Sequence, residues 1–110
     1  MAMSKISIEF THAGFAIRTR KFLWFHVQHS VIWDEVLEIR AEIKDCFSFH
    51  TFGLRFMISS DEGYLVCDDD AIWPELYEKV LQIFPAIDRA VIAKAEASFP
   101  DECSMICWQG

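Results

Sequence analysis

The sequence predicts a single α+β domain over residues 1–110, in which an antiparallel sheet is packed by two C-terminal helices. Three observations lead to this class. A length of 110 residues corresponds to about one domain. A hydrophobic fraction of 53%, with ten Phe and four Trp, is enough to form a core. Apolar residues alternate with polar ones in the first part of the chain and follow helical spacing after residue 71. We expect about five or six strands arranged as a meander or half-barrel.

The first strands are indicated by alternation. Apolar residues at Ile6, Ile8 and Phe10 alternate with polar ones, and residues 11–14 supply a turn. The run from Phe15 to Val27 is too long for one ordinary strand and has three basic residues in its middle. We therefore expect it to break into two strands or to bend, with residues 22–27 as its buried part.

Residues 30–45 decide the fold class, because two periodicities compete there. Leu37, Ile39, Ala41 and Ile43 alternate with charged residues, as in a strand with one buried face. The same residue types favour a helix intrinsically, and residues 36, 39 and 43 could form a helical stripe capped by Ser30. The strand separates apolar from charged positions more cleanly, so the prediction is a strand that Trp33 begins.

The next segments continue the sheet. Residues 46–51 are expected to connect to a strand over 52–58, in which residues 52, 54, 56 and 58 alternate with residues 53, 55 and 57. Residues 59–63 form a strong turn signal, and residues 64–67 return as a short strand. Residues 104–108 are expected to add a last short strand.

Two helices are predicted in the last third. The first has an apolar stripe and ends at Pro85, with Pro74 tolerated in its first turn. We expect the Asp68-Asp69-Asp70 run to cap its start, where carboxylates favour the positive end of the helix dipole. The second helix runs over about 87–98, with residues 87, 91, 95 and in part 92 facing inward, until Phe99-Pro100 stops it. The stripe of the first helix consists of Ile72, Trp73, Leu76, Tyr77, Val80, Leu81 and Phe84.

The negative charge is concentrated in the second half of the chain. The net charge is −7, with +1 over residues 1–60 and −8 over residues 61–110. An acidic surface repels phosphate backbones and anionic headgroups, so we expect neither nucleic-acid nor membrane binding. Basic proteins or cations are the favoured partners, although solubility alone would also explain the charge. The candidate partner-binding residues are Asp61, Glu62, Asp68, Asp69, Asp70, Glu75 and Glu78.

No catalytic, cofactor or metal motif stands out, so the sequence predicts a protein that is not an enzyme and takes no cofactor. The chain has no GxGxxG, P-loop, GxSxG or HExxH pattern. His12 and His50 have no adjacent nucleophile or carboxylate, and the Asp68–Asp70 run lacks the spacing of an EF-hand. Cys103 and Cys107 could join His26 and His29 at a zinc ion only with unusual spacing.

The cysteines and the N-terminus favour a cytoplasmic location. The chain has four cysteines without a close CxxC pair, which we interpret as free thiols in a reducing compartment. The N-terminus lacks the apolar stretch and cleavage site of a signal peptide, and no apolar run is long enough to span a membrane.

A short set of motifs resembles a group of small uncharacterised bacterial proteins. The motifs are Trp33-Asp34-Glu35-Val36, Ile39-x-Ala41 followed by Lys44-Asp45, an acidic stretch before a Trp-bearing helix, and Phe84-Pro85 with Phe99-Pro100. This chain departs from the group's I-x-A-x-K-x-D form in having Ile43-Lys44-Asp45 without the spacer. The resemblance covers residues 31–108. It implies a compact sheet closed by a C-terminal helix, similar to a pleckstrin-homology-like half-barrel, and it implies no activity.

Two hypotheses about function follow. The first is a non-enzymatic interaction protein, such as an immunity protein or antitoxin that neutralises a basic partner with its acidic half. Residues 22–25 and 47–52 carry apolar side chains on both faces of their expected strands, which indicates a partner surface or a homodimer through exposed aromatic residues. The alternative is a small-ligand or lipid-binding module with an aromatic cavity between sheet and helix.

Overall fold

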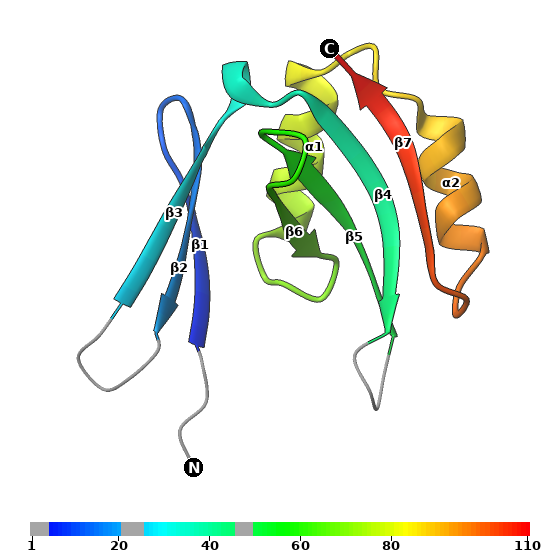
Figure 1. Cartoon of the computed structure of the whole chain (residues 1–110), viewed down its shortest axis with the longest axis horizontal. Coiled ribbons are helices and arrows are strands. Elements are labelled where there is room, and N and C mark those ends of the chain that lie inside the picture. The colour runs from blue at the N-terminus through cyan, green and yellow to red at the C-terminus, as the bar shows by residue number, and fades with distance from the viewer. Residues whose placement is uncertain (1–4, 21–25, 46–49) are drawn as a thin grey trace. The chain divides into compact units, whose positions relative to one another are not determined.

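A computed structural model describes residues 5–20, 26–45 and 50–110, which form two compact units, residues 1–35 and 36–110 (Figure 1). The α+β class is confirmed. The expectation of one sheet with about five or six strands is wrong, because the described residues form seven antiparallel strands in two sheets. One sheet has three strands and the other has four, and neither closes into a barrel.

The 1–35 unit is an antiparallel meander of β1 (Lys5–Phe10), β2 (Gly14–Arg20) and β3 (His26–Ile32). The predicted strand over residues 6–10 is confirmed as β1. The long run that follows breaks into two strands, as expected, and pairs Phe15 with Val31 across them. Of its predicted buried part, residues 22–25 lie outside the described residues, and β3 begins at His26.

Trp33 does not begin a strand. It opens a 3₁₀ turn, η1 (Trp33–Glu35), and its backbone N–H donates to the Ala13 carbonyl at 3.0 Å. Its ring packs on Phe15 with 5.2 Å between the ring centroids, and the side chain is half-buried. The expected start of the next strand is therefore wrong by several residues, because the chain turns here before the second sheet begins.

The four-stranded sheet of the 36–110 unit has the order β6-β5-β4-β7, built from β4 (Glu38–Asp45), β5 (His50–Met57), β6 (Gly63–Cys67) and β7 (Cys103–Gln109). The prediction of a strand rather than a helix within residues 30–45 is confirmed as β4. Ile39, Ala41 and Ile43 are buried on one face. Leu37 is not, at 54% exposed, because it precedes the ladder that starts at Glu38. Its predicted place in the buried row is wrong.

β5 is buried on both faces. Phe52, Leu54 and Phe56 line the face that continues the Ile39 row, while Thr51 and Met57 are buried on the opposite face at 7% and 8% exposed. The strand begins at His50 rather than Phe52, so the predicted connection over 46–51 is too long. Residues 46–49 lie outside the described residues. Ile58 falls after the strand ends.

Two helices, α1 (Trp73–Ile83) and α2 (Arg89–Ala97), cover one face of this sheet (Figure 1). The predicted stripe of α1 places Leu76 and Val80 in the core. Phe84, directly after the helix, packs edge-to-face on Trp108 of β7 with 4.6 Å between centroids. α2 contacts β4 and β7 and buries Ile92 and Ala95. Val91, which is predicted to face inward, is only half-buried, because Ile92 occupies the core side of the helix.

The predicted cap of α1 by the Asp68–Asp70 run is wrong. The N-cap residue is Ile72, which has a helical backbone and no side-chain cap. Asp70 accepts from the Ile72 N–H at 3.0 Å, one residue before the helix, and the Asp68 N–H donates to the Phe52 carbonyl at 2.8 Å. The run therefore forms the turn between β6 and α1. Asp88 is the residue that caps a helix, since it accepts from the N–H groups of Ala90 and Val91 in α2.

Within the described ranges, no helix has the length and apolar character needed to cross a membrane.

Candidate functional site: an acidic and aromatic pocket

The predicted partner-binding residues fall into two groups that lie at opposite ends of β6. Asp61 and Glu62 belong to the turn before the strand, and the Asp68–Asp70 run follows it. A strand rises about 3.3 Å per residue, so the two groups are roughly 20 Å apart along β6. The structure does not bring all seven residues into one surface.

The first group stabilises its own turn. The Ser59 hydroxyl donates to the Asp61 carboxylate at 3.0 Å, and the Tyr64 hydroxyl donates to the Glu62 carboxylate at 2.7 Å. This hydrogen bond, with a smaller effect of burial, raises the pKa of Tyr64 above its usual value. Both carboxylates therefore have a local structural role, as expected of polar residues in a tight turn.

The second group surrounds the start of α1. Asp68, Asp69, Glu75 and Glu78 are exposed, whereas Asp70 is half-buried by its turn. Glu75 and Glu78 are three residues apart and share one side of the helix. Burial, followed by the charge of Asp69, raises the pKa of Asp68. Negative charge is thus crowded where β6 passes into α1.

Asp68 also lines a pocket of about 310 Å³, together with His50, Phe52, Glu96 and Phe99. We call these five residues the acid–aromatic pocket. They come from the start of β5, the turn after β6, the end of α2 and the residues that follow α2. In Figure 1 these segments gather at the end of the sheet where α1 begins and α2 ends.

Backbone pairing and ring contacts build the pocket. The Asp68–Phe52 backbone hydrogen bond ties the end of β6 to β5, and His50 lies two residues from Phe52, hence on the same face of the strand. The His50 ring meets Phe99 edge-on, with 6.3 Å between centroids. Phe52 meets Trp73 in the same way at 6.1 Å. Trp73 in turn stacks on Tyr77 at 5.6 Å, so the aromatic contacts extend along α1.

Phe99 is the aromatic member that faces solvent. It is 53% exposed, and the other large apolar residues exposed in the described part of the chain are aliphatic. Its position is set by the turn after α2, where its N–H donates to the Glu96 carbonyl at 3.2 Å. Aromatic side chains are enriched at protein interfaces, so an exposed one marks this part of the surface as a candidate contact.

The charged residues of the acid–aromatic pocket are both negative. Asp68 and Glu96 line it without any Lys or Arg. Two other pockets lie on the sheet face opposite the helices, and each contains both signs of charge. In one, of about 390 Å³, Arg55 donates to Glu42 at 2.9 Å. Such pairs cancel their own fields, so of these three pockets in the described part of the chain it is the acid–aromatic pocket whose lining carries unbalanced charge.

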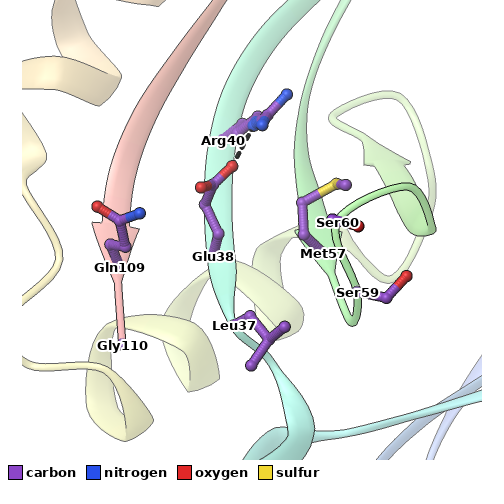
Figure 2. Close-up of a pocket in the computed structure, with 8 residues that line it drawn as sticks. All are labelled: Leu37, Glu38, Arg40, Met57, Ser59, Ser60, Gln109 and Gly110. Carbon is purple, nitrogen blue, oxygen red and sulfur yellow. Dashed lines mark hydrogen bonds and ion pairs between the residues drawn. The ribbon is translucent and has the colours of Figure 1, made fainter.

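The second of these pockets has a volume of about 280 Å³ and is shown in Figure 2. The Arg40 guanidinium donates to the Glu38 carboxylate beside it on β4. The remaining side chains are uncharged, so this groove presents no net charge to a ligand. Its lining residues are Leu37, Glu38, Arg40, Met57, Ser59, Ser60, Gln109 and Gly110.

The cysteines of the described ranges are not part of this site. Cys67, Cys103 and Cys107 are free thiols, and Cys107 is buried. Burial raises the pKa of Cys107 to about 11. Among the residues that the structure describes, no group of three or more His, Cys, Asp or Glu side chains could hold a metal ion.

Sequence reasoning identified only Asp68 among the pocket residues. Phe99-Pro100 is predicted to stop the second helix, and Glu96 falls within that helix without a predicted role. His50 was placed in a connection. Of the apolar segments expected to form a partner surface, residues 22–25 and 47–49 lie outside the described residues, and Phe52 is buried. No signal within one sequence indicates that residues 50, 68 and 96 meet.

Comparisons with known proteins identify no relative. No family model, no curated protein and no solved structure matches this chain. The resemblance to small bacterial proteins and to a pleckstrin-homology-like half-barrel stays a prediction.

Proposed function

We propose that this chain is a non-enzymatic interaction protein that binds a basic protein partner, as an immunity protein or antitoxin does. The contact surface is the acidic end of the helix layer, formed by Asp68, Asp69, Glu75 and Glu78 together with the acid–aromatic pocket. The observation that carries the proposal is the exposed, unbalanced negative charge around a pocket with an exposed aromatic side chain.

The distribution of charge supports this proposal. Residues 61–110 contain eleven acidic and three basic residues, and ten of the eleven acidic residues are exposed. A surface of one sign accelerates association with an oppositely charged partner and disfavours partners of like charge. The aromatic residues add apolar area beside the charges, which a partner can cover.

The test compares two variants that change the net charge equally. D69N/E75Q/E78Q removes three exposed carboxylates at the start of α1, and E9Q/D34N/E35Q removes three exposed carboxylates of the 1–35 unit. The full chain is used to capture its partner from cells of its source, and the association rate is measured by surface plasmon resonance at several salt concentrations. We expect the first variant to associate about tenfold more slowly at low salt and the second to change by less than about twofold.

Two outcomes would contradict the proposal. One is the failure to capture a stoichiometric protein partner. The other is an equal loss of association rate in both variants, because overall charge rather than this surface would then control binding.

A second candidate function is a small-ligand or lipid-binding module. It is favoured by the two Phe rings and the His50 ring that line the same pocket. A thermal-shift screen of lipids, nucleotides and small amines tests it, since a ligand that binds only the folded state raises the melting temperature with concentration. A flat screen would remove this candidate.

A further inference from the structure

We propose that the acid–aromatic pocket is the anchor site for a single arginine side chain of the basic partner. This inference rests on the proposed function and specifies which chemical group the surface recognises. The guanidinium would lie between the carboxylates of Asp68 and Glu96 and against the exposed ring of Phe99. Each part of this assignment follows from the pocket's lining.

The negative charges of Asp68 and Glu96 favour the binding of a cation. Within the part of the chain that the structure describes, neither Asp68 nor Glu96 forms an ion pair. The last carbonyl groups of α2 lie at the same end of the unit as Glu96, and a helix C-terminus carries partial negative charge. The neighbouring acidic residues Asp69, Glu75 and Glu78 add to this field. Burial raises the pKa of Asp68, and the charge of Asp69 raises it further.

The aromatic side chains favour a guanidinium over an ammonium group. Arginine presents a planar, weakly hydrated cation that stacks on aromatic rings and donates to carboxylates in a fixed fork. Phe99, which is exposed, and Phe52, which is buried, line the same pocket as Glu96. Arginine is also enriched among residues that dominate binding at interfaces. The ammonium group of a lysine would pair with the carboxylates but would not stack on the Phe99 ring as a planar guanidinium does.

The pocket differs from the two grooves on the other face of the sheet. There, Arg55 already pairs with Glu42, and Arg40 with Glu38. Those carboxylates are bound to arginine residues of this chain, whereas the acid–aromatic pocket lacks an arginine among its lining residues. An arginine from a partner would complete the same kind of pair.

The experiment titrates the full chain with N-acetyl-arginine amide and follows backbone amide signals by NMR. Matched probes are N-acetyl-lysine amide and the neutral isostere N-acetyl-citrulline amide. We expect the arginine probe to shift signals of residues around His50, Asp68 and Phe99, with a dissociation constant on the order of millimolar. The lysine probe should bind several-fold more weakly, and the citrulline probe should not saturate.

Variants then separate the contribution of the carboxylate to binding of the probe from that of the Phe99 ring. E96Q and F99A are each expected to weaken the arginine probe at least fivefold, while E102Q, an exposed carboxylate in a different pocket, leaves it unchanged. F99L keeps the apolar volume without the ring, so it should abolish the preference for arginine over lysine. Because Phe99 is largely exposed, these variants are expected to stay folded, and their spectra check this.

Several results would overturn the inference. Saturating shifts with citrulline, equal affinity for arginine and lysine, shifts confined to residues 75–78, or equal effects of E96Q and E102Q each contradict an arginine pocket. A protein partner that is lost in D69N/E75Q/E78Q but unaffected by E96Q and F99A would contradict the pocket and leave the proposed function standing. Specific binding of the arginine probe, together with a failure to find any protein partner, would contradict the proposed function and leave the arginine pocket standing.

Discussion

The Cys107 thiol lies inside the core of the 36–110 unit, where its Sγ atom donates to the Ile39 carbonyl at 3.3 Å. Burial raises its pKa to about 11. At pH 8 about one such thiol in a thousand is a thiolate, and the thiolate is the reactive form. We expect iodoacetamide to modify half-buried Cys67 and Cys103 in the native protein, and Cys107 only after unfolding. Mass spectrometry of the digested peptides measures this, and rapid native labelling of Cys107 would contradict it.

Gly53 has no space for a side chain. A Cβ atom there would clash with the carbonyl oxygen of Val66 and lie 3.0 Å from the Cα atom of Cys67 on the neighbouring strand. Both atoms belong to the backbone, so the sheet itself would have to move. We expect Gly53→Ala to lower the free energy of unfolding by about 1–3 kcal/mol, measured by urea denaturation. In Gly110→Ala the Cβ atom would meet the side chain of Trp108 at 3.0 Å and lie at ordinary contact distance, 3.7 Å, from the Leu37 carbonyl oxygen, so this variant should change it by less than about 0.5 kcal/mol.

The titration of Asp68 is expected to make the free energy of unfolding depend on pH. Its pKa in the folded protein lies above the usual 3.8 because of burial and of Asp69, so folding disfavours its charged form. The stability associated with this group is complete below its unfolded pKa and is lost as the pH rises through the folded value. Asp68→Asn should therefore be more stable than the parent at pH 7, and the difference should shrink as the pH approaches 3.8. A variant that is less stable at pH 7 would contradict this cause, and Glu78→Gln serves as a control at another acidic residue of the same surface.

At the level of elements, alternation was sufficient to identify β4 against a competing helix. The period of two sorted charged from apolar side chains along the whole segment, and intrinsic helix preference is a weaker effect. The same pattern could not locate the first residue of the ladder. Leu37 continues the alternation, and its backbone N–H donates to the Met57 carbonyl, yet the strand begins at Glu38 and the Leu37 side chain is exposed.

The helix ends show why local signals can mislead. Three consecutive aspartates before an amphipathic stripe satisfy every expectation for a cap, but a turn between β6 and α1 uses them instead. Asp88 is the N-cap of α2, one residue after the predicted start of that helix at residue 87, so the prediction placed it inside the helix. The candidate site was mostly unpredictable for a related reason. Its residues come from four segments, and only tertiary packing brings them together.

The cap assignment leads to a direct comparison. Asp88→Ala removes an acceptor for the N–H groups of Ala90 and Val91 and should destabilise the protein by about 1 kcal/mol. Asp69→Ala, in the run that sequence analysis favoured as a cap, should change the stability by less than about 0.5 kcal/mol. Thermal or urea unfolding of both variants measures the difference. Equal losses would show that Asp88 is not the residue that holds the start of α2.

At the scale of the whole molecule, charge divides between the two units. Residues 1–35 contain four basic and three acidic residues, a net charge of +1, and residues 36–110 contain six basic and fourteen acidic residues, a net charge of −8. The net negative charge of the chain therefore comes from residues 36–110, the unit with the helices and the pocket. A partner attracted by charge would be steered toward that unit.

The 1–35 unit is too short to be expected to fold by itself. Chains below about 40 residues rarely fold alone without disulfides, metals or a partner, and residues 1–35 contain no cysteine. We expect a peptide of residues 1–35 to give the circular dichroism of an unfolded chain, without a sigmoidal transition on heating. The full chain, predicted from its length to be one domain, should unfold in a single step in which fluorescence and circular dichroism coincide. A cooperative transition of the peptide, or two separated steps in the full chain, would show that the three-stranded sheet is stable on its own, and the prediction of one domain would then be wrong.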